Sequence, residues 1–100
     1  MFIFITRFQV TGAAADFERA LGRISEHSHL DPGFHTHRLY RSRKDPAVYV
    51  EVAEWSDPEA HRRFIASPAF QEPIQEVRKL ATAEPAPFEL LAEHVPTGPE

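Results

Sequence analysis

Two histidines in the first half of the chain have a spacing suited to shared chemistry. His35 and His37 are separated by one residue in a segment typical of a β-strand, where alternate side chains point to the same face. Two imidazoles on one face can act as bases or ligate a metal, with Glu51 from an adjacent strand as a third ligand. A metal site also needs a fixed trio of ligands and groups that hold them, and no other spacing in the chain supplies these. The pattern therefore favours a neutral histidine as general base, and we expect no bound metal.

Arg7 and Trp55 complete the set of candidate catalytic residues. Arg7 interrupts an otherwise apolar strand, where its guanidinium can hold an anionic or phenolate oxygen or pair with Glu51 or Glu89 across the sheet. Trp55 is the single tryptophan and ends a predicted strand. Its ring can stack on a flat aromatic substrate while its N–H fixes a carbonyl or peroxide oxygen. The alternative is a structural role, in which the indole closes the core where strand meets helix.

The remaining histidines carry less information. His27 and His29 close a predicted helix, where imidazoles commonly interact with the last carbonyls, and we interpret both as structural. His61 lies in a run of charged residues, which predicts a solvent-facing side chain. His94 stays without an assigned role.

Composition bounds the class of protein. The chain has 100 residues, 42% hydrophobic and 11% aromatic content and a net charge of −4, which fits one folded domain and excludes a disordered segment. The absence of a basic stripe argues against nucleic acid, and no apolar run is long enough for a membrane span. With no cysteine, disulfides and thiolate sites are excluded. The N-terminal residues do not resemble a signal peptide, so a cytoplasmic location is expected.

Periodicity and turn residues predict seven elements, with helices at 13–28 and in two pieces that start at Pro58 and Pro68. Strands are predicted at 2–10, 34–41, 47–55 and 88–95. This β-α-β-β-α-α-β order predicts an α+β, ferredoxin-like split βαβ fold, in which a four-stranded antiparallel sheet carries its helices on one face. We assign 1–95 to a single domain and 96–100 to a flexible tail.

The face of the sheet without helices is the expected place for a cavity. In strand 47–55 the valines suit packing against helices, whereas the alternate residues mix aromatic and polar groups, as pocket walls do. We therefore expect a homodimer that closes two such faces around a cavity, rather than a solvated sheet face. The predicted substrate-binding residues are Tyr49, Glu51, Phe4, Ile5 and Leu39.

Two segments then carry a family resemblance. Residues 50–60 (VEVAEWSDPEA) and 64–70 (FIASPAF), together with the pair Gly33-Phe34, resemble the antibiotic-biosynthesis monooxygenase (ABM) family. The resemblance implies a dimeric α+β barrel. Studied members oxygenate electron-rich phenols or anthrones to quinones without metal, haem or flavin, and others degrade haem or isomerise small molecules.

The chain departs from the family pattern at several positions. Many members have histidines where this chain has Phe64 and Ala69. The haem-degrading members need an asparagine, a tryptophan and an axial histidine at positions that match Arg7, Phe64 and Ile74 here. Since isoleucine cannot ligate iron, haem degradation is disfavoured.

The function expected from residues and resemblance together is oxygenation of a small, electron-rich aromatic by O₂ without a cofactor. His35 or His37 would remove a phenolic proton, and Arg7 and Trp55 would stabilise the anion. A cyclase or isomerase on the same fold, and a non-catalytic binding dimer, are the alternatives.

Overall fold

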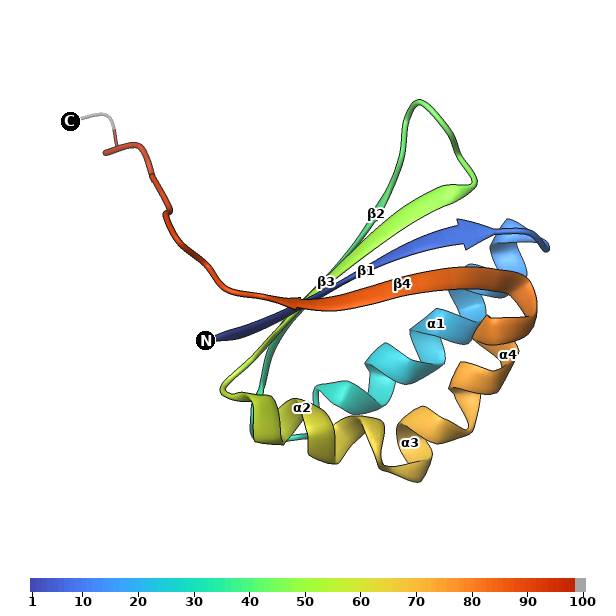
Figure 1. The fold of residues 1–100 in the computed structure, drawn as a ribbon, viewed down its shortest axis with the longest axis horizontal. Coiled ribbons are helices and arrows are strands. Elements are labelled where there is room, and N and C mark those ends of the chain that lie inside the picture. Colours follow the sequence, from blue (N-terminus) through green and yellow to red (C-terminus); the bar gives the residue numbers. More distant parts are fainter. Residues whose placement is uncertain (99–100) are drawn as a thin grey trace.

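Four antiparallel strands and four helices make up the fold in a computed structural model that describes residues 1–98. The strands lie in the order β2-β3-β1-β4, which is the α+β, ferredoxin-like arrangement predicted from the sequence. The helices all cover one face of this sheet (Figure 1). In chain order the elements are β1 (Phe2–Val10), α1 (Ala14–Ser28), β2 (Phe34–Arg41), β3 (Val48–Trp55), α2 (Pro58–Ile65), α3 (Pro68–Gln71), α4 (Pro73–Leu80) and β4 (Ala81–Phe88).

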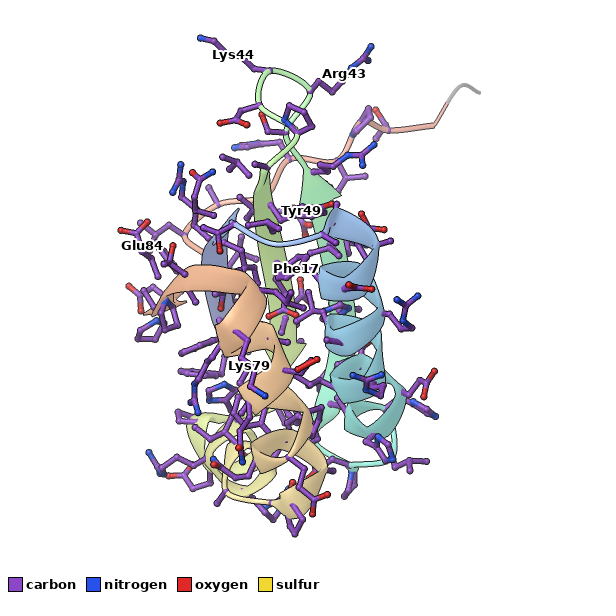
Figure 2. All side chains as sticks on the ribbon, turned by 90° about the vertical axis from the view of Figure 1, so that its right-hand side faces the viewer. Phe17, Arg43, Lys44, Tyr49, Lys79 and Glu84 are labelled. Atoms are coloured by element: carbon purple, nitrogen blue, oxygen red, sulfur yellow. The ribbon has the colours of Figure 1, made fainter. Side chains whose placement is uncertain are left out.

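The core lies between α1 and the two central strands. Phe17 on α1 is fully buried and packs against Phe8 of β1 and Tyr49 of β3, with ring centroids 5.1 and 4.9 Å apart. Figure 2 shows Phe17 and Tyr49 in the space between α1 and the sheet. Leu21 and Ile24 extend the same apolar stripe at helical spacing. Burial of the alternate residues on β1 therefore fixes which face of the sheet the helices cover.

The predicted facing of β3 is wrong. Phe8 pairs with Tyr49 and Phe2 with Trp55, so the aromatic and polar set of β3 lies on the helix side with the core residues of β1. The valines Val48, Val50 and Val52 lie on the uncovered face instead. The reason is volume, because Tyr49 and Trp55 fill the space under the helices and are each only 2% exposed.

The last strand lies seven residues earlier than predicted, at Ala81–Phe88. In the sequence its prolines indicate the end of a helix rather than a strand. Within residues 1–98, however, β4 is an edge strand that pairs with β1 alone. Pro85 and Pro87 occupy alternate positions opposite Thr6 and Phe4. Because N–H groups alternate between the two sides of a strand, both missing donors fall on one side, and the pairing with β1 is retained.

Three of the helices, α2, α3 and α4, begin at a proline. Asp57 caps α2, its carboxylate accepting a hydrogen bond from the Ala60 N–H at 2.8 Å, and Pro58 occupies the first turn. The helix predicted from Pro68 onward is divided into α3 and α4. Pro73 lacks the N–H that a continuous helix needs there, so a new helix begins at that residue.

Beyond Phe88 the chain leaves the sheet. Residues 89–98 have no regular secondary structure and run away from the body of the domain (Figure 1). Of the tail predicted over 96–100, the last two residues lie outside the described part of the chain. Within residues 1–98, no helix combines the length and apolar character needed to cross a membrane.

Candidate active site

A cavity of about 590 Å³ lies between the sheet and its helices. Every strand and every helix contributes to its wall. The wall is mainly apolar, with aromatic rings from Phe4, Phe34, Trp55, Phe64 and Phe70. The expectation of a cavity on the uncovered sheet face is therefore corrected: this cavity lies on the helix side, within one chain. The cause is the facing of β3, which points its mixed aromatic and polar residues toward the helices.

A carboxylate and an imidazole in this wall are in direct contact. His37 Nε2 lies 2.7 Å from Glu51 Oε2, and both side chains are about one-fifth exposed. They come from the neighbouring strands β2 and β3, where His37 pairs with Ala53 and Glu51 lies two residues from Ala53 on the same face. An ionised Glu51 accepts the hydrogen bond from Nε2–H, which leaves Nδ1 of the imidazole as the proton acceptor. This pair unites two of the predicted site residues in one contact.

Trp55 lies in the same wall and is almost fully buried. Its ring packs against Phe34 and Phe64, with ring centroids 5.4 Å away in each case. Among residues 1–98, its indole Nε1 is the only fully buried side-chain polar atom without a hydrogen-bond partner. A buried N–H without an acceptor costs about 1–3 kcal/mol, so this atom carries a standing penalty in the folded protein.

His61 is the residue that sequence reasoning placed wrongly. It is 8% exposed rather than solvent-facing, and it lines the cavity. Its ring packs against Phe2, Phe4 and Trp55, with ring centroids 5.4, 4.2 and 5.8 Å away. The sequence held a signal for this, since Ala60, His61 and Phe64 share one helical face at i, i+1 and i+4.

Burial lowers the pKa of His61, and Arg62 acts in the same direction, while the carboxylate of Glu51 opposes them. The imidazole is therefore neutral at physiological pH. A neutral ring has one nitrogen that donates and one that accepts, so this side chain can both take and return a proton.

Mild acid is expected to destabilise the fold through His61. An unfolded chain protonates this residue near pH 6.5, whereas the folded chain resists protonation until a lower pH. Between these two values the unfolded state binds more protons, so the free energy of unfolding falls as the pH falls. Urea unfolding of the wild type and His61→Phe between about pH 7 and 5 tests this. The wild type should lose more stability over this window than the variant, and parallel curves would contradict the assignment.

Two predicted catalytic residues lie away from the cavity. Arg7 points to the uncovered face and forms an exposed ion pair with Glu84 of β4, at 3.4 Å. The alternative of a cross-sheet pair is thus the one observed, although with a different glutamate from those expected. A bulge between Phe34 and Thr36 breaks the alternation of β2. His35 is consequently exposed, with Nε2 2.8 Å from Ser56 Oγ, and does not share the position of His37.

Among the predicted substrate-binding residues, Phe4 and Glu51 line the cavity. Tyr49 lies on the helix side but outside the cavity wall, and its hydroxyl donates to Glu18 Oε2 at 2.5 Å. Burial raises the pKa of Tyr49, and the hydrogen bond to Glu18 adds to this effect. Ile5 lies on the uncovered face, and Leu39 is 37% exposed at the edge strand β2. Their positions follow from the register of the strands.

No trio of metal-binding side chains is formed by histidine, aspartate and glutamate residues within the described range 1–98. The contact between His37 and Glu51 is a hydrogen bond in which the carboxylate can orient the imidazole.

The sequence and the fold both match proteins of one family. The model of the antibiotic biosynthesis monooxygenase family matches residues 1–76. The chain belongs to this family. It is 38% identical over 81 residues to a deoxynogalonate monooxygenase of Streptomyces nogalater, a match that covers 81% of this chain and 69% of that protein. The resemblance noted for residues 50–60 and 64–70 is therefore confirmed.

Solved structures extend the comparison. The crystal structure of SnoaB, described as a cofactor-independent oxygenase from Streptomyces nogalater, superposes with a TM-score of 0.88 at 36% identity, covering 92% of this ABM chain and 94% of SnoaB. A conserved protein from Methanosarcina mazei Go1 has a TM-score of 0.82 at 17% identity, with 87% of this chain and 89% of that one covered. At that identity the second likeness concerns the fold alone.

Proposed function

We propose that this ABM-type monooxygenase uses O₂, without a cofactor, to oxidise an electron-rich polycyclic phenol or anthrone. The observation that carries the proposal is the unpartnered indole N–H of Trp55 in the wall of an apolar, aromatic cavity. The likeness to SnoaB, a cofactor-independent oxygenase, supports the same chemistry. The substrate class follows from the wall, because flat aromatic rings pack best on the faces and edges of other aromatic rings.

The size and character of the cavity suit such a substrate. Its volume of about 590 Å³ falls within the roughly 300–1,000 Å³ typical of ligand sites. Phe4, Phe34 and Phe70 provide apolar contact for ring carbons. His37, Glu51 and Trp55 are among the polar residues of the wall, and their polar atoms can fix the orientation of the ligand. A neutral, flat molecule with one or two oxygen substituents satisfies both requirements.

The first chemical step is loss of a substrate proton. Nδ1 of His37 accepts a phenolic or benzylic proton, while Glu51 fixes the ring and stands beside the positive charge that the imidazole acquires. The resulting anion is stabilised by the Trp55 N–H, which donates to the substrate oxygen. A mainly apolar wall strengthens this interaction because it lowers the local dielectric constant.

Oxygenation then follows with the substrate as the only reductant. The anion transfers one electron to O₂, and the radical pair combines to form a C–O bond and, after protonation, a hydroperoxide. Loss of water gives the carbonyl of the quinone. In sum a CH₂ group and O₂ become a C=O group and water, so the carbon loses four electrons and the two oxygen atoms gain them.

The proposal is tested by oxygen uptake from chelator-treated protein with a panel of anthrones, naphthols and dihydroquinones. Catalysed uptake that yields quinone is the expected result, and His37→Gln is expected to lower it about 100-fold or more because the base is lost. His29→Gln serves as the matched control, since that histidine is exposed outside the cavity wall. Binding of the panel without uptake above the uncatalysed rate would overturn the proposal and favour a cyclase, isomerase or binding role.

The proposed enzyme is a homodimer joined through the uncovered sheet face. This face carries the half-buried residues Ile3, Ile5, Val48, Val50 and Val52, which no helix covers. Charges of both signs, such as those of Arg7 and Glu84, surround this patch and suit the self-complementary contact of two identical faces. Sedimentation analysis should give twice the chain mass for the wild type and the single mass for Val50→Asp. A monomeric wild type at micromolar concentration would contradict this assembly.

A further inference from the structure

The side chain of His61 points in a different direction from the other charged or titratable side chains of α2. Glu59, Arg62 and Arg63 of the same helix are more than half exposed in their side chains. His61 alone among these points toward the sheet and reaches the cavity. His61 therefore enters the cavity wall from the helix layer. His37 and Glu51 enter the same wall from the sheet, on β2 and β3.

The surroundings of His61 give its nitrogens no evident structural task. Three aromatic rings surround the imidazole, and within residues 1–98 neither ring nitrogen takes part in a side-chain hydrogen bond. A phenylalanine would satisfy the same packing without the cost of burying polar atoms. The charged groups near it are Glu51 on β3 and Arg62 on α2, while the rings of Phe2 and Phe4 contact it from β1. The site thus holds a neutral imidazole with a free acceptor and a free donor.

His61 also differs from His37 in its neighbour. The Nε2 of His37 is engaged with Glu51, whereas the ring of His61 packs edge-on against the ring of Trp55, with centroids 5.8 Å apart. In the proposed reaction, the substrate lies against Trp55 in the cavity wall. A substrate held there also lies beside the ring of His61.

We infer that His61 is the catalytic residue that converts the hydroperoxide to the quinone, an inference that rests on the proposed oxygenase function. The free nitrogen of His61 takes the proton from the carbon that bears the peroxide. The C–H and O–O bonds break together, the C–H electron pair forms the second bond of C=O, and hydroxide leaves. The imidazolium returns its proton to the hydroxide, which gives water and restores neutral His61. The carbon loses two electrons and the peroxide oxygens gain them, so no further reactant is needed.

The separate roles proposed for His37 and His61 can be measured with two different readouts. Oxygen uptake reports the step assigned to His37, and the quinone absorbance reports the step assigned to His61. In His61→Gln, quinone formation is expected to slow at least tenfold relative to oxygen uptake. A hydroperoxide 32 mass units above the substrate should accumulate, and added imidazole should restore quinone formation in His61→Ala.

A second assay starts from a chemically prepared anthrone hydroperoxide under nitrogen, which removes the oxygenation step. The wild type should accelerate its dehydration, His61→Gln and His61→Phe should not, and His29→Gln should match the wild type. His61→Phe preserves the aromatic packing, and its thermal midpoint shows whether the fold is intact. Equal dehydration by wild type and variants would overturn the role of His61. A wild type that consumes no oxygen but dehydrates the hydroperoxide would overturn the oxygenase proposal instead.

Discussion

Trp55→Phe is expected to lower kcat/KM for oxygen uptake about 100-fold while changing the stability of the fold very little. The phenylalanine ring retains most of the contact with Phe34 and Phe64 but has no N–H to donate. Removal of one donor to a developing oxyanion typically costs about 10²–10³ in rate. The loss of buried carbon is offset by removal of an unsatisfied polar atom, so the free energy of unfolding should shift by no more than about 1 kcal/mol.

The two readouts must be taken on the same samples. Urea unfolding gives the stability, and an oxygen electrode with the best substrate of the panel gives the rate. Trp55→Ala provides the contrast, because it should lose both activity and about 3–5 kcal/mol of stability. If Trp55→Phe retained wild-type turnover, the indole would have only a packing role, which is the alternative that the sequence left open.

Phe17→Ala is expected to reduce the free energy of unfolding by about 3–5 kcal/mol. Phe17 is fully buried between Phe8 and Tyr49, so its removal leaves a void that α1 and the sheet cannot easily close. For a domain of this size, whose total stability is about 5–15 kcal/mol, such a loss brings the fold near its limit.

The same experiment separates the core from the site. Phe17 does not line the cavity, so the folded fraction of Phe17→Ala should keep wild-type turnover. Leu30→Ala is the matched control, because Leu30 is 71% exposed and its removal should change stability by less than about 0.5 kcal/mol. A loss below about 1 kcal/mol for Phe17→Ala would mean that the core does not depend on this ring.

The fold was largely predictable because its signals are local. The alternation in Phe2–Val10, the apolar stripe of Phe17, Leu21 and Ile24, and the capping sequence at Asp57 each specify one element without reference to the rest of the chain. The order of these elements then restricts the topology. β4 was misplaced because its prolines are compatible with a strand only at an edge, and edge position is a property of the whole sheet.

The candidate site was predicted less well because it depends on which face of the sheet each strand residue occupies. The alternation of β3 is clear in the sequence, but both of its sides hold apolar residues, so the pattern does not reveal which side meets the helices. His37, Glu51 and Trp55 therefore lie in the cavity wall, although the cavity was predicted on the other face of the sheet. The bulge that removes His35 depends on pairing with β3 and leaves no signal in the sequence of β2.

The prolines of β4 restrict how copies of this chain can associate. The free edge of a sheet is normally a template on which a foreign strand can bind, and repeated addition of this kind leads to fibres. Pro85 and Pro87 have no backbone N–H to donate at that outer edge. An incoming strand therefore cannot form a continuous set of hydrogen bonds with β4. Growth along the hydrogen-bonding direction is thereby hindered at the β4 edge, whereas the opposite edge strand, β2, contains no proline. In the proposed homodimer, the contact between two uncovered sheet faces would be complete after two copies and would add no further strand to either sheet.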